Sequence, residues 1–339
     1  MTWRHARWSA DHPLPIGVVE RTAVGQAVNA GDVIAAGMAL GTAIRLKGAR
    51  RLGLQTADME RELRVPVGSE VSAGTLLART GRRFPRTLTA PIDGRLLHLT
   101  ADGDVYVAPI VGRWIVRSTL DGAVTRSDDA GVTVEGEAWC IEAAAAYGPD
   151  AIGELTLGVN APMEDLAPSR LDVRLGGRIM IGGARVSAEV LTRAHACGVS
   201  GLVAGGAPVA GLRVVYGESL TASGHAGRED RPTVICLIAF GGAALPAAIF
   251  GPLAALAGSR AAIHTASARL FVFAPADAGV FATDELDLAL APDYASVRAL
   301  VAETVNGEVT FPSEVRAGAV RQGDLVVPSA NVRAFHAKR

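Results

Sequence analysis

The sequence predicts a multidomain protein of the α/β plus β class: an N-terminal β domain, a central α/β domain with a mostly parallel sheet, and a small C-terminal β-barrel. Three observations predict this. A glycine-containing element occurs twice near the start, strand-like and helix-like segments alternate after residue 170, and the last region alternates around Asn306-Gly307. The 339 residues, 49% of them hydrophobic, suffice for several cores. We divide the chain into an extension (1–16), a β domain (17–118), a mixed connecting region (119–169), an α/β domain (170–275) and a β-barrel (276–339).

The first domain carries an internal repeat. Residues 24–35 read VGQAVNAGDVIA and residues 67–78 read VGSEVSAGTLLA, so both match V-G-x-x-V-x-A-G-x-x-x-A. We expect Gly25, Gly31, Gly68 and Gly74 in turns with positive φ, and the alternating apolar residues indicate short, half-buried strands. The repeat therefore predicts an all-β domain.

The second copy is followed by residues 87–99, TLTAPIDGRLLHL, which read as strand, Pro-initiated turn and strand. The order G-x-x-V-x-A-G-x-x-L-A, then A-P-x-D-G-x-L, resembles the barrel-sandwich hybrid of biotinyl and lipoyl domains. This resemblance implies a rigid β module, whose carrier members present a modified lysine on the intervening hairpin. The corresponding residues 79–86, RTGRRFPR, contain no lysine, so we expect no prosthetic group and no cofactor.

The tip of this hairpin is basic instead. One hypothesis is an exposed docking knob for a protein partner, and the alternative is an ordinary solvated turn. The candidate docking residues are Arg82, Arg83, Phe84 and Arg86.

The next regions alternate between strand and helix patterns. In the connecting region, Val132–Glu135 is strand-like and the alanine-rich segment Cys140–Tyr147 is interpreted as helical. Beyond it, we expect strands over 178–183, 199–206, 233–240 and 260–273. Ser187 is a plausible N-cap for a helix ending near Gly198. This alternation predicts a mostly parallel sheet with flanking helices.

Residues 234–259 carry no charge over a membrane-spanning length. Glycine and proline interrupt the segment, and its first third is rich in β-branched residues. We therefore interpret it as a buried strand followed by a core helix over Pro246–Ala257, so membrane insertion is not favoured.

Glycine pairs follow three of the predicted strands. The carboxyl ends of strands in open α/β sheets are where small ligands bind, and backbone N–H groups at helix starts favour anions. A polar loop could supply acid, base or clamping groups at the same edge. The alternative is that the glycines simply end the strands, and none matches a nucleotide-binding motif. The candidate ligand-binding residues are Gly182, Gly183, Gly205, Gly206, Gly241, Gly242, His225, Arg228 and Arg231.

The C-terminal region is predicted to be β because strand-like segments flank Asn306-Gly307. Its ending, GDLVVPSANV over 323–332, resembles the last strands of KOW and SH3-like barrels. That resemblance implies contact with RNA or protein, although the glycine-rich opening of a KOW motif is missing. The whole domain order resembles that of certain proteins of green non-sulfur bacteria, which implies no activity.

Composition argues against several functions. The formal net charge of −1 gives no general attraction to nucleic acid or anionic membranes. Lysine occurs only at Lys47 and Lys338, which argues against lysine-dependent chemistry. The three cysteines are far apart and the histidines occur singly, so we nominate no metal ligand and no catalytic residue. The start of the chain lacks an apolar signal-peptide core, which predicts a cytoplasmic location.

These patterns favour a non-catalytic scaffold or assembly subunit that uses β modules to dock protein partners or copies of itself. One alternative is an enzyme or sensor that binds a small anion or nucleotide at the Gly-Gly strand ends. Another is RNA binding through the C-terminal barrel, which the low aromatic content does not favour.

Overall fold

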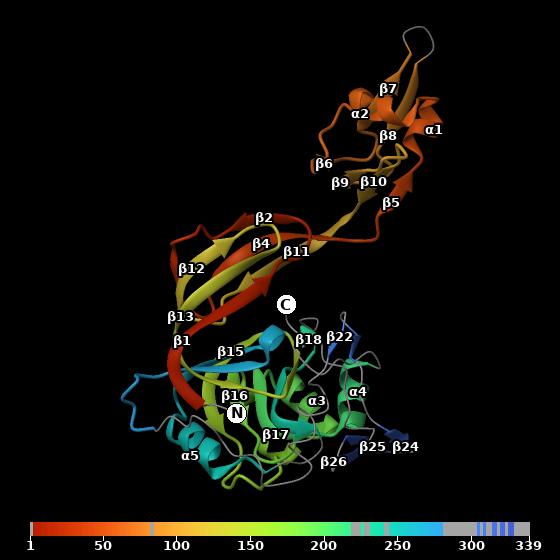
Figure 1. Cartoon of the computed structure of the whole chain (residues 1–339). Helices are drawn as coiled ribbons and strands as arrows, with labels where there is room; N and C mark the ends of the chain where they lie inside the picture. Colours follow the sequence, from red (N-terminus) through yellow and green to blue (C-terminus); the bar gives the residue numbers. More distant parts are fainter. Residues whose placement is uncertain are drawn as a thin grey trace.

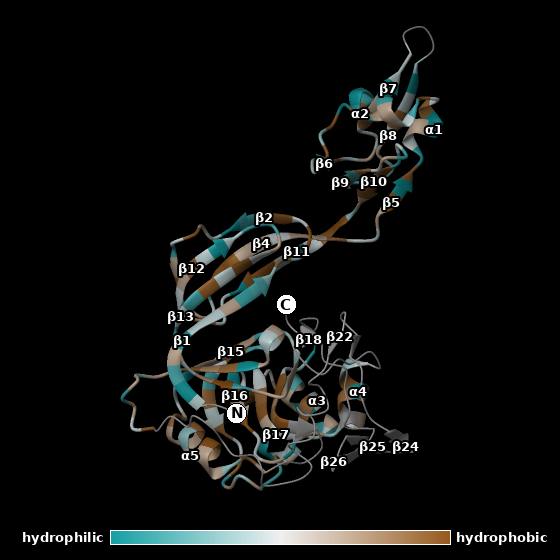
Figure 2. Cartoon of the chain, in the orientation of Figure 1, coloured by the Kyte–Doolittle hydropathy of each residue, from teal (hydrophilic) through white to brown (hydrophobic). Residues whose placement is uncertain are grey.

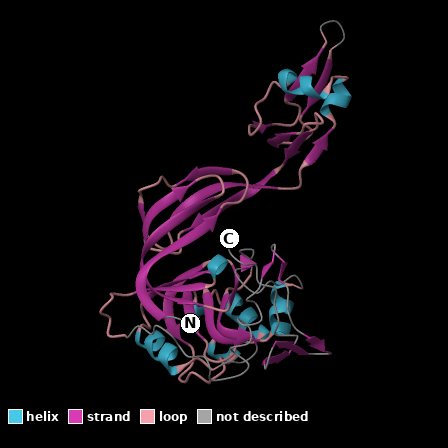
Figure 3. Cartoon of the chain, viewed as in Figure 1, coloured by secondary structure: helices cyan, strands magenta, loops and turns pink. Residues whose placement is uncertain are grey.

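The computed structural model describes residues 3–81, 85–217, 225–226, 231–240 and 244–280, together with short strands between 304 and 328. Figure 1 shows an elongated molecule with three parts. A large body, here called the base, is joined by a narrow ribbon to a small outer domain over residues 44–108. Strands dominate all three parts (Figure 3). The protein is thus a β-rich α/β protein with one large mixed sheet and several small antiparallel sheets.

Twelve of the described strands form the large sheet of the base. Parallel pairing joins four neighbours at its centre: β15 (Ala151–Leu157), β16 (Arg178–Ile181), β17 (Gly201–Ala207) and β19 (Val234–Phe240). The strands β14 (Ala145–Gly148) and β20 (Arg260–His264) flank this run and are antiparallel to it. The sheet is therefore mixed, with a short parallel run, where the sequence predicted a mostly parallel sheet.

The remaining strands of the large sheet are mostly antiparallel. β20 pairs with β21, which pairs with one end of the long strand β13, and β12 pairs with the other end of β13 and with β3. β1 pairs along nearly the whole length of β13, and β18 adds to β14. The bounds are β1 (Trp3–Pro13), β3 (Ala27–Val28), β12 (Gly122–Ser127), β13 (Gly131–Glu142), β18 (His225–Ala226) and β21 (Arg269–Phe273).

Three helices pack against this sheet. α3 (Ala188–Ala196) and α4 (Val209–Tyr216) contact each other, while α5 (Ala247–Ala255) lies apart from them in Figure 1. The predicted cap is confirmed, because the hydroxyl of Ser187 accepts a hydrogen bond from the backbone N–H of Val190 at 3.3 Å. Hydrophobic residues are frequent along the central strands of the base (Figure 2). Among the described residues, no helix combines the length and the apolar character needed to cross a membrane.

Two expected elements of the base were wrong. Cys140–Tyr147 is not a helix but the end of β13 and the strand β14. Alanine favours helices locally, yet Ala143–Tyr147 are buried on all sides and pair as a central strand would. The segment 260–273 is also not one strand, because a 3₁₀ turn over Thr265–Ser267 folds it into the antiparallel pair β20 and β21.

The outer domain has its own four-stranded sheet, in the order β5-β10-β9-β6, and a separate hairpin of β7 and β8. Its core includes the fully buried side chains of Leu52, Met59, Leu77, Leu88 and Leu96. The bounds are β5 (Ile44–Leu46), α1 (Gly48–Leu52), α2 (Met59–Glu62), β6 (Glu70–Val71), β7 (Leu76–Thr80), β8 (Arg86–Thr89), β9 (Gly94–Leu99) and β10 (Val105–Ala108).

The ribbon consists of β11 (Ile110–Arg117), β4 (Val33–Leu40) and β2 (Val18–Arg21) in that order, all antiparallel. The chain enters the outer domain from β4 and leaves it into β11, so this domain is inserted at the far end of the β4–β11 pair (Figure 1).

The sequence repeat is also a structural repeat. All four predicted glycines have positive φ, between 85° and 102°, which confirms the expectation for those turns. Equivalent backbone bonds recur: the N–H of Gly25 donates to the carbonyl of Val124 at 2.8 Å, and that of Gly68 donates to Leu96 at 2.7 Å. In each copy, the turn is therefore hydrogen-bonded to a later strand that lies outside the repeated V-G-x-x-V-x-A-G-x-x-x-A motif.

Those later strands are repeated as well. β12 pairs with β13 as β9 pairs with β10, and both pairs carry a register shift at the same place. β3 pairs with β12 as β6 pairs with β9, and β1 lies against β13 as β5 lies against β10. The β4–β11 pair corresponds to the β7–β8 hairpin. The molecule thus contains two copies of one unit, with the outer domain inserted into the hairpin of the other copy.

Near the C-terminus, β22 (Thr304–Val305) pairs antiparallel with β23 (Glu308–Val309), as the Asn306-Gly307 signal predicted. A three-stranded antiparallel sheet follows: β24 (Glu314–Arg316), β25 (Ala319–Gln322) and β26 (Leu325–Pro328). The residues that would close these strands into a barrel lie outside the described part of the chain.

Candidate functional site

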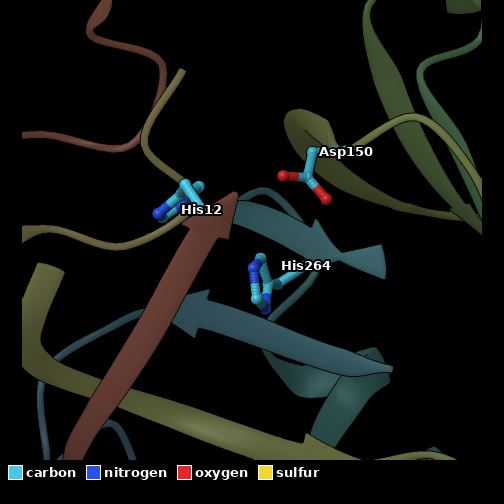
Figure 4. Close-up of side chains that lie close together, drawn as sticks. All are labelled: His12, Asp150 and His264. Atoms are coloured by element: carbon cyan, nitrogen blue, oxygen red, sulfur yellow. The ribbon is translucent and has the colours of Figure 1, made fainter. Parts of the chain in front are cut away.

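Three side chains that are distant in sequence meet inside the base. His12 lies near the end of β1, Asp150 precedes β15, and His264 is the last residue of β20 (Figure 4). One ring nitrogen of each histidine and one carboxylate oxygen of Asp150 lie within 4.8 Å of one another. The antiparallel pairing of β15 with β20 brings Asp150 and His264 to the same end of the sheet.

His12 is buried, with 1% of its surface exposed. Its Nε2 lies 3.0 Å from the hydroxyl oxygen and 3.0 Å from the backbone nitrogen of Thr119. Its Nδ1 is buried and has no hydrogen-bond partner in the described chain. Burial and the neighbouring His264 lower the pKa of His12 to about 4, so its imidazole is neutral at pH 7.

His264 is also buried, and its two ring nitrogens have different partners. Nε2 lies 3.0 Å from the carbonyl oxygen of Asp11, which can only accept, so Nε2 carries a proton. Nδ1 lies 2.5 Å from the hydroxyl oxygen of Ser267. These contacts fix the plane of the ring.

Asp150 completes the cluster. One of its carboxylate oxygens accepts a hydrogen bond from the backbone N–H of Thr265 at 2.8 Å. Burial raises the pKa of Asp150, and the nearby His12 opposes that rise. A cavity of about 370 Å³ lies beside His264, and its lining includes Asp11 and Ser267 but neither His12 nor Asp150.

The arrangement offers two imidazoles and one carboxylate to a shared space, a donor set suited to borderline divalent metals. No metal ligand was predicted from the sequence. His12 and His264 are more than 250 positions apart, and neither belongs to a short ligand motif. Only strand pairing brings them together, so no local pattern could have identified this cluster.

The predicted ligand edge is partly described. Gly182–Gly183 follow β16, Gly205–Gly206 lie within the last part of β17, and the two pairs are neighbours. The N–H of Gly205 donates to Gly183 at 2.8 Å, and that of Gly206 donates to the carbonyl of Ala184 at 3.0 Å. These two N–H groups are therefore already used within the fold.

The other candidates for that edge are scattered. Arg231 donates from Nη1 to the carbonyl of Val215 at 2.8 Å, at the end of α4. The backbone of His225 lies in β18, beside β14. Gly241, Gly242 and Arg228 lie outside the described residues.

The predicted docking hairpin is β7–β8, at the end of the outer domain farthest from the base (Figure 1). Arg86 begins β8 and is exposed, whereas Arg82, Arg83 and Phe84 lie outside the described residues. A Cβ atom on Gly53, just after α1, would lie 2.3 Å from the guanidinium of Arg86. α1 and the hairpin are therefore in contact.

No protein-family model, no curated protein and no solved structure matches this chain. The repeat and the three-residue cluster are therefore interpreted from their own geometry.

Proposed function

We propose that the protein is a non-catalytic assembly subunit that uses its outer domain to dock an acidic surface of a protein partner. The observation that carries this proposal is a group of exposed arginines at the far end of the molecule. They are Arg50 and Arg51 of α1, Arg79 of β7 and Arg86 of β8, called here the arginine end.

The arginine end differs from the rest of the outer domain in its charge pairing. The described ion pairs of that domain are Arg45–Asp104, Arg61–Asp58 and Arg64–Glu62, and none includes the four residues of the arginine end. Arg82 and Arg83 add two further positive charges to the same hairpin in the sequence. A concentrated charge without internal partners favours fast, oriented association with a surface of opposite sign.

The inferred relation to barrel-sandwich hybrids fits the same role. In the carrier members, the corresponding hairpin holds the modified lysine, whereas residues 79–86 have arginine and no lysine. Lys47 immediately precedes α1 and is not in the hairpin. We therefore propose that the hairpin makes contacts instead of carrying a group, in a protein of the cytoplasm.

Lys47 provides a specific test, because it is one of only two lysines and lies close to the arginine end. Amine-reactive cross-linking of the full-length protein in native extract, followed by mass spectrometry, should link Lys47 to an acidic region of one partner. Substituting Arg50, Arg51, Arg79 and Arg86 by Glu should abolish this cross-link and the co-purification of the partner. Arg113→Glu, an exposed change in the ribbon, should leave both intact.

Nuclease treatment separates this proposal from RNA binding. A protein-mediated association survives the nuclease, and an association through RNA disappears with it. Native mass spectrometry that finds only an isolated monomer, with no cross-link at Lys47, would contradict the assembly role.

A further inference from the structure

Of the two buried histidines, His264 is oriented as metal ligands usually are. A metal-bound imidazole typically donates its other ring N–H to a carbonyl, a carboxylate or a similar acceptor, which fixes its orientation. The Nε2–H of His264 donates to the carbonyl of Asp11 at 3.0 Å. The Nε2 of His12 accepts a hydrogen bond from the backbone N–H of Thr119 at 3.0 Å and also lies 3.0 Å from the hydroxyl oxygen of that residue. In both rings Nε2 is held. Nδ1 of His264 lies 2.5 Å from the hydroxyl oxygen of Ser267, and Nδ1 of His12 has no hydrogen-bond partner in the described chain.

A second observation that points to a ligand is the unpaired Nδ1 atom of His12. It is buried without a hydrogen-bond partner in the described chain, and buried polar atoms in folded proteins are normally paired. If Nδ1 carried the proton, a buried N–H would have no acceptor. This is the case in the metal-free ring, because the backbone N–H of Thr119 donates to Nε2 and the single ring proton is therefore on Nδ1. A metal ion at Nδ1 would displace this proton to Nε2, which would then donate to the hydroxyl oxygen of Thr119.

The internal repeat shows that the fold does not need a polar group here. His12 lies opposite Val132 in the β1–β13 pair, and Leu46 lies opposite Val105 at the equivalent position of the β5–β10 pair. Leu46 is buried in the core of the outer domain. An apolar side chain can therefore fill this strand position, and the imidazole of His12 calls for a different explanation.

We propose that His12, Asp150 and His264 bind a borderline divalent transition-metal ion, of the class of Zn²⁺ or Fe²⁺, inside the base. Two imidazoles and one carboxylate suit these ions, whereas Ca²⁺ and Mg²⁺ require mostly oxygen ligands. Three protein ligands leave at least one coordination position for water or another small molecule. A cavity of about 370 Å³ is lined on one side by His264 and Ser267.

The remaining features of the cluster agree with this donor set. The N–H of Thr265 donates to one oxygen of Asp150 at 2.8 Å, which fixes the position of the carboxylate. The hydroxyl of Ser267 lies beside Nδ1 of His264 and would rotate aside or bind the metal itself.

The test uses the metal-free full-length protein. Titration calorimetry with Zn²⁺ should give one site per chain, and Co²⁺ should produce visible d–d absorption that Zn²⁺ removes. His12→Leu copies the residue of the other repeat, and Asp150→Asn keeps the shape of the carboxylate. Each should weaken Zn²⁺ binding by about 100-fold or more and abolish the Co²⁺ spectrum.

His195→Ala is the matched control, because His195 is an exposed histidine on α3. It should change neither the affinity nor the spectrum. The far-ultraviolet circular dichroism of each metal-free variant shows whether it is folded, and if His12→Leu does not fold, His12→Gln replaces it. The proposal is wrong if the unmodified protein binds no Zn²⁺, or if folded Asp150→Asn and His12 variants bind it as tightly as the His195→Ala control.

Discussion

The two copies of the repeated unit have the same backbone plan and different surroundings. In the outer domain, the hairpin β7–β8 is short and ends in arginines. In the other copy, the equivalent pair β4–β11 is long and holds the whole outer domain at its end. The copy that contains β4 and β11 also has its other strands in the large sheet of the base. The two copies therefore share their turns and strand registers. Their roles in the molecule differ with what lies at the end of the hairpin and with the sheet in which the other strands pair.

The largest expected effect comes from two equivalent glycines at which strands approach closely. A Cβ on Gly122 would lie 1.9 Å from the carbonyl oxygen of Glu135, and one on Gly94 would lie 2.0 Å from that of Ala108. We expect Gly122→Ala and Gly94→Ala each to cost about 3 kcal/mol or more of unfolding free energy, because backbone must move.

The two substitutions should destabilise different parts of the molecule. Amide hydrogen exchange should speed up mainly within 44–108 for Gly94→Ala and in the base for Gly122→Ala. Gly112→Ala is the control, since its Cβ would meet only Ala39, at 3.9 Å. Equal exchange throughout the chain for both variants would contradict the independence of the outer domain.

The second comparison concerns His12 and its counterpart Leu46. The pKa of His12 falls from 6.5 to about 4 on folding, so the unfolded chain binds more protons between these values. Stability from this group is therefore complete above about pH 6.5 and is lost as the pH falls toward 4, by about 3 kcal/mol in total. Asp150, whose pKa is raised, acts in the opposite direction.

Urea unfolding of the metal-free protein between pH 4 and pH 7.5 measures this effect. His12→Leu should remove most of the loss of stability on acidification, while His195→Ala should retain it. An unchanged pH dependence in His12→Leu would mean that His12 is not a buried neutral group.

The smallest expected effect involves the carboxylates that hold the repeated turns. Asp121 accepts a hydrogen bond from the N–H of Ala30 at 2.6 Å, and Asp93 accepts one from Ala73 at 2.7 Å. Ala30 is buried and Ala73 is exposed, so water can replace Asp93 more readily. We expect Asp121→Ala to cost about 1–3 kcal/mol and Asp93→Ala less. Thermal unfolding measures both, and the reverse order would show that the two turns are not held in the same way.

Much of the local structure was predictable because its causes are local. Gly25 and Gly74 have the positive φ that their motif requires, and Ser187 caps α3 as its position suggested. The error at Cys140–Tyr147 shows the limit of local reasoning. Alanine there favours a helix, but burial between strands and pairing with β19 make it β14.

The sequence by itself determined the repeat, its turns, most of the strands and the absence of a lysine in the outer hairpin. These depend on residue type and on spacings within a few positions. Only the tertiary structure decided that one copy is inserted in the hairpin of the other, and that His12, Asp150 and His264 share one buried space. Strand pairing between distant segments controls both features, and its energy comes from contacts that no short stretch of sequence contains.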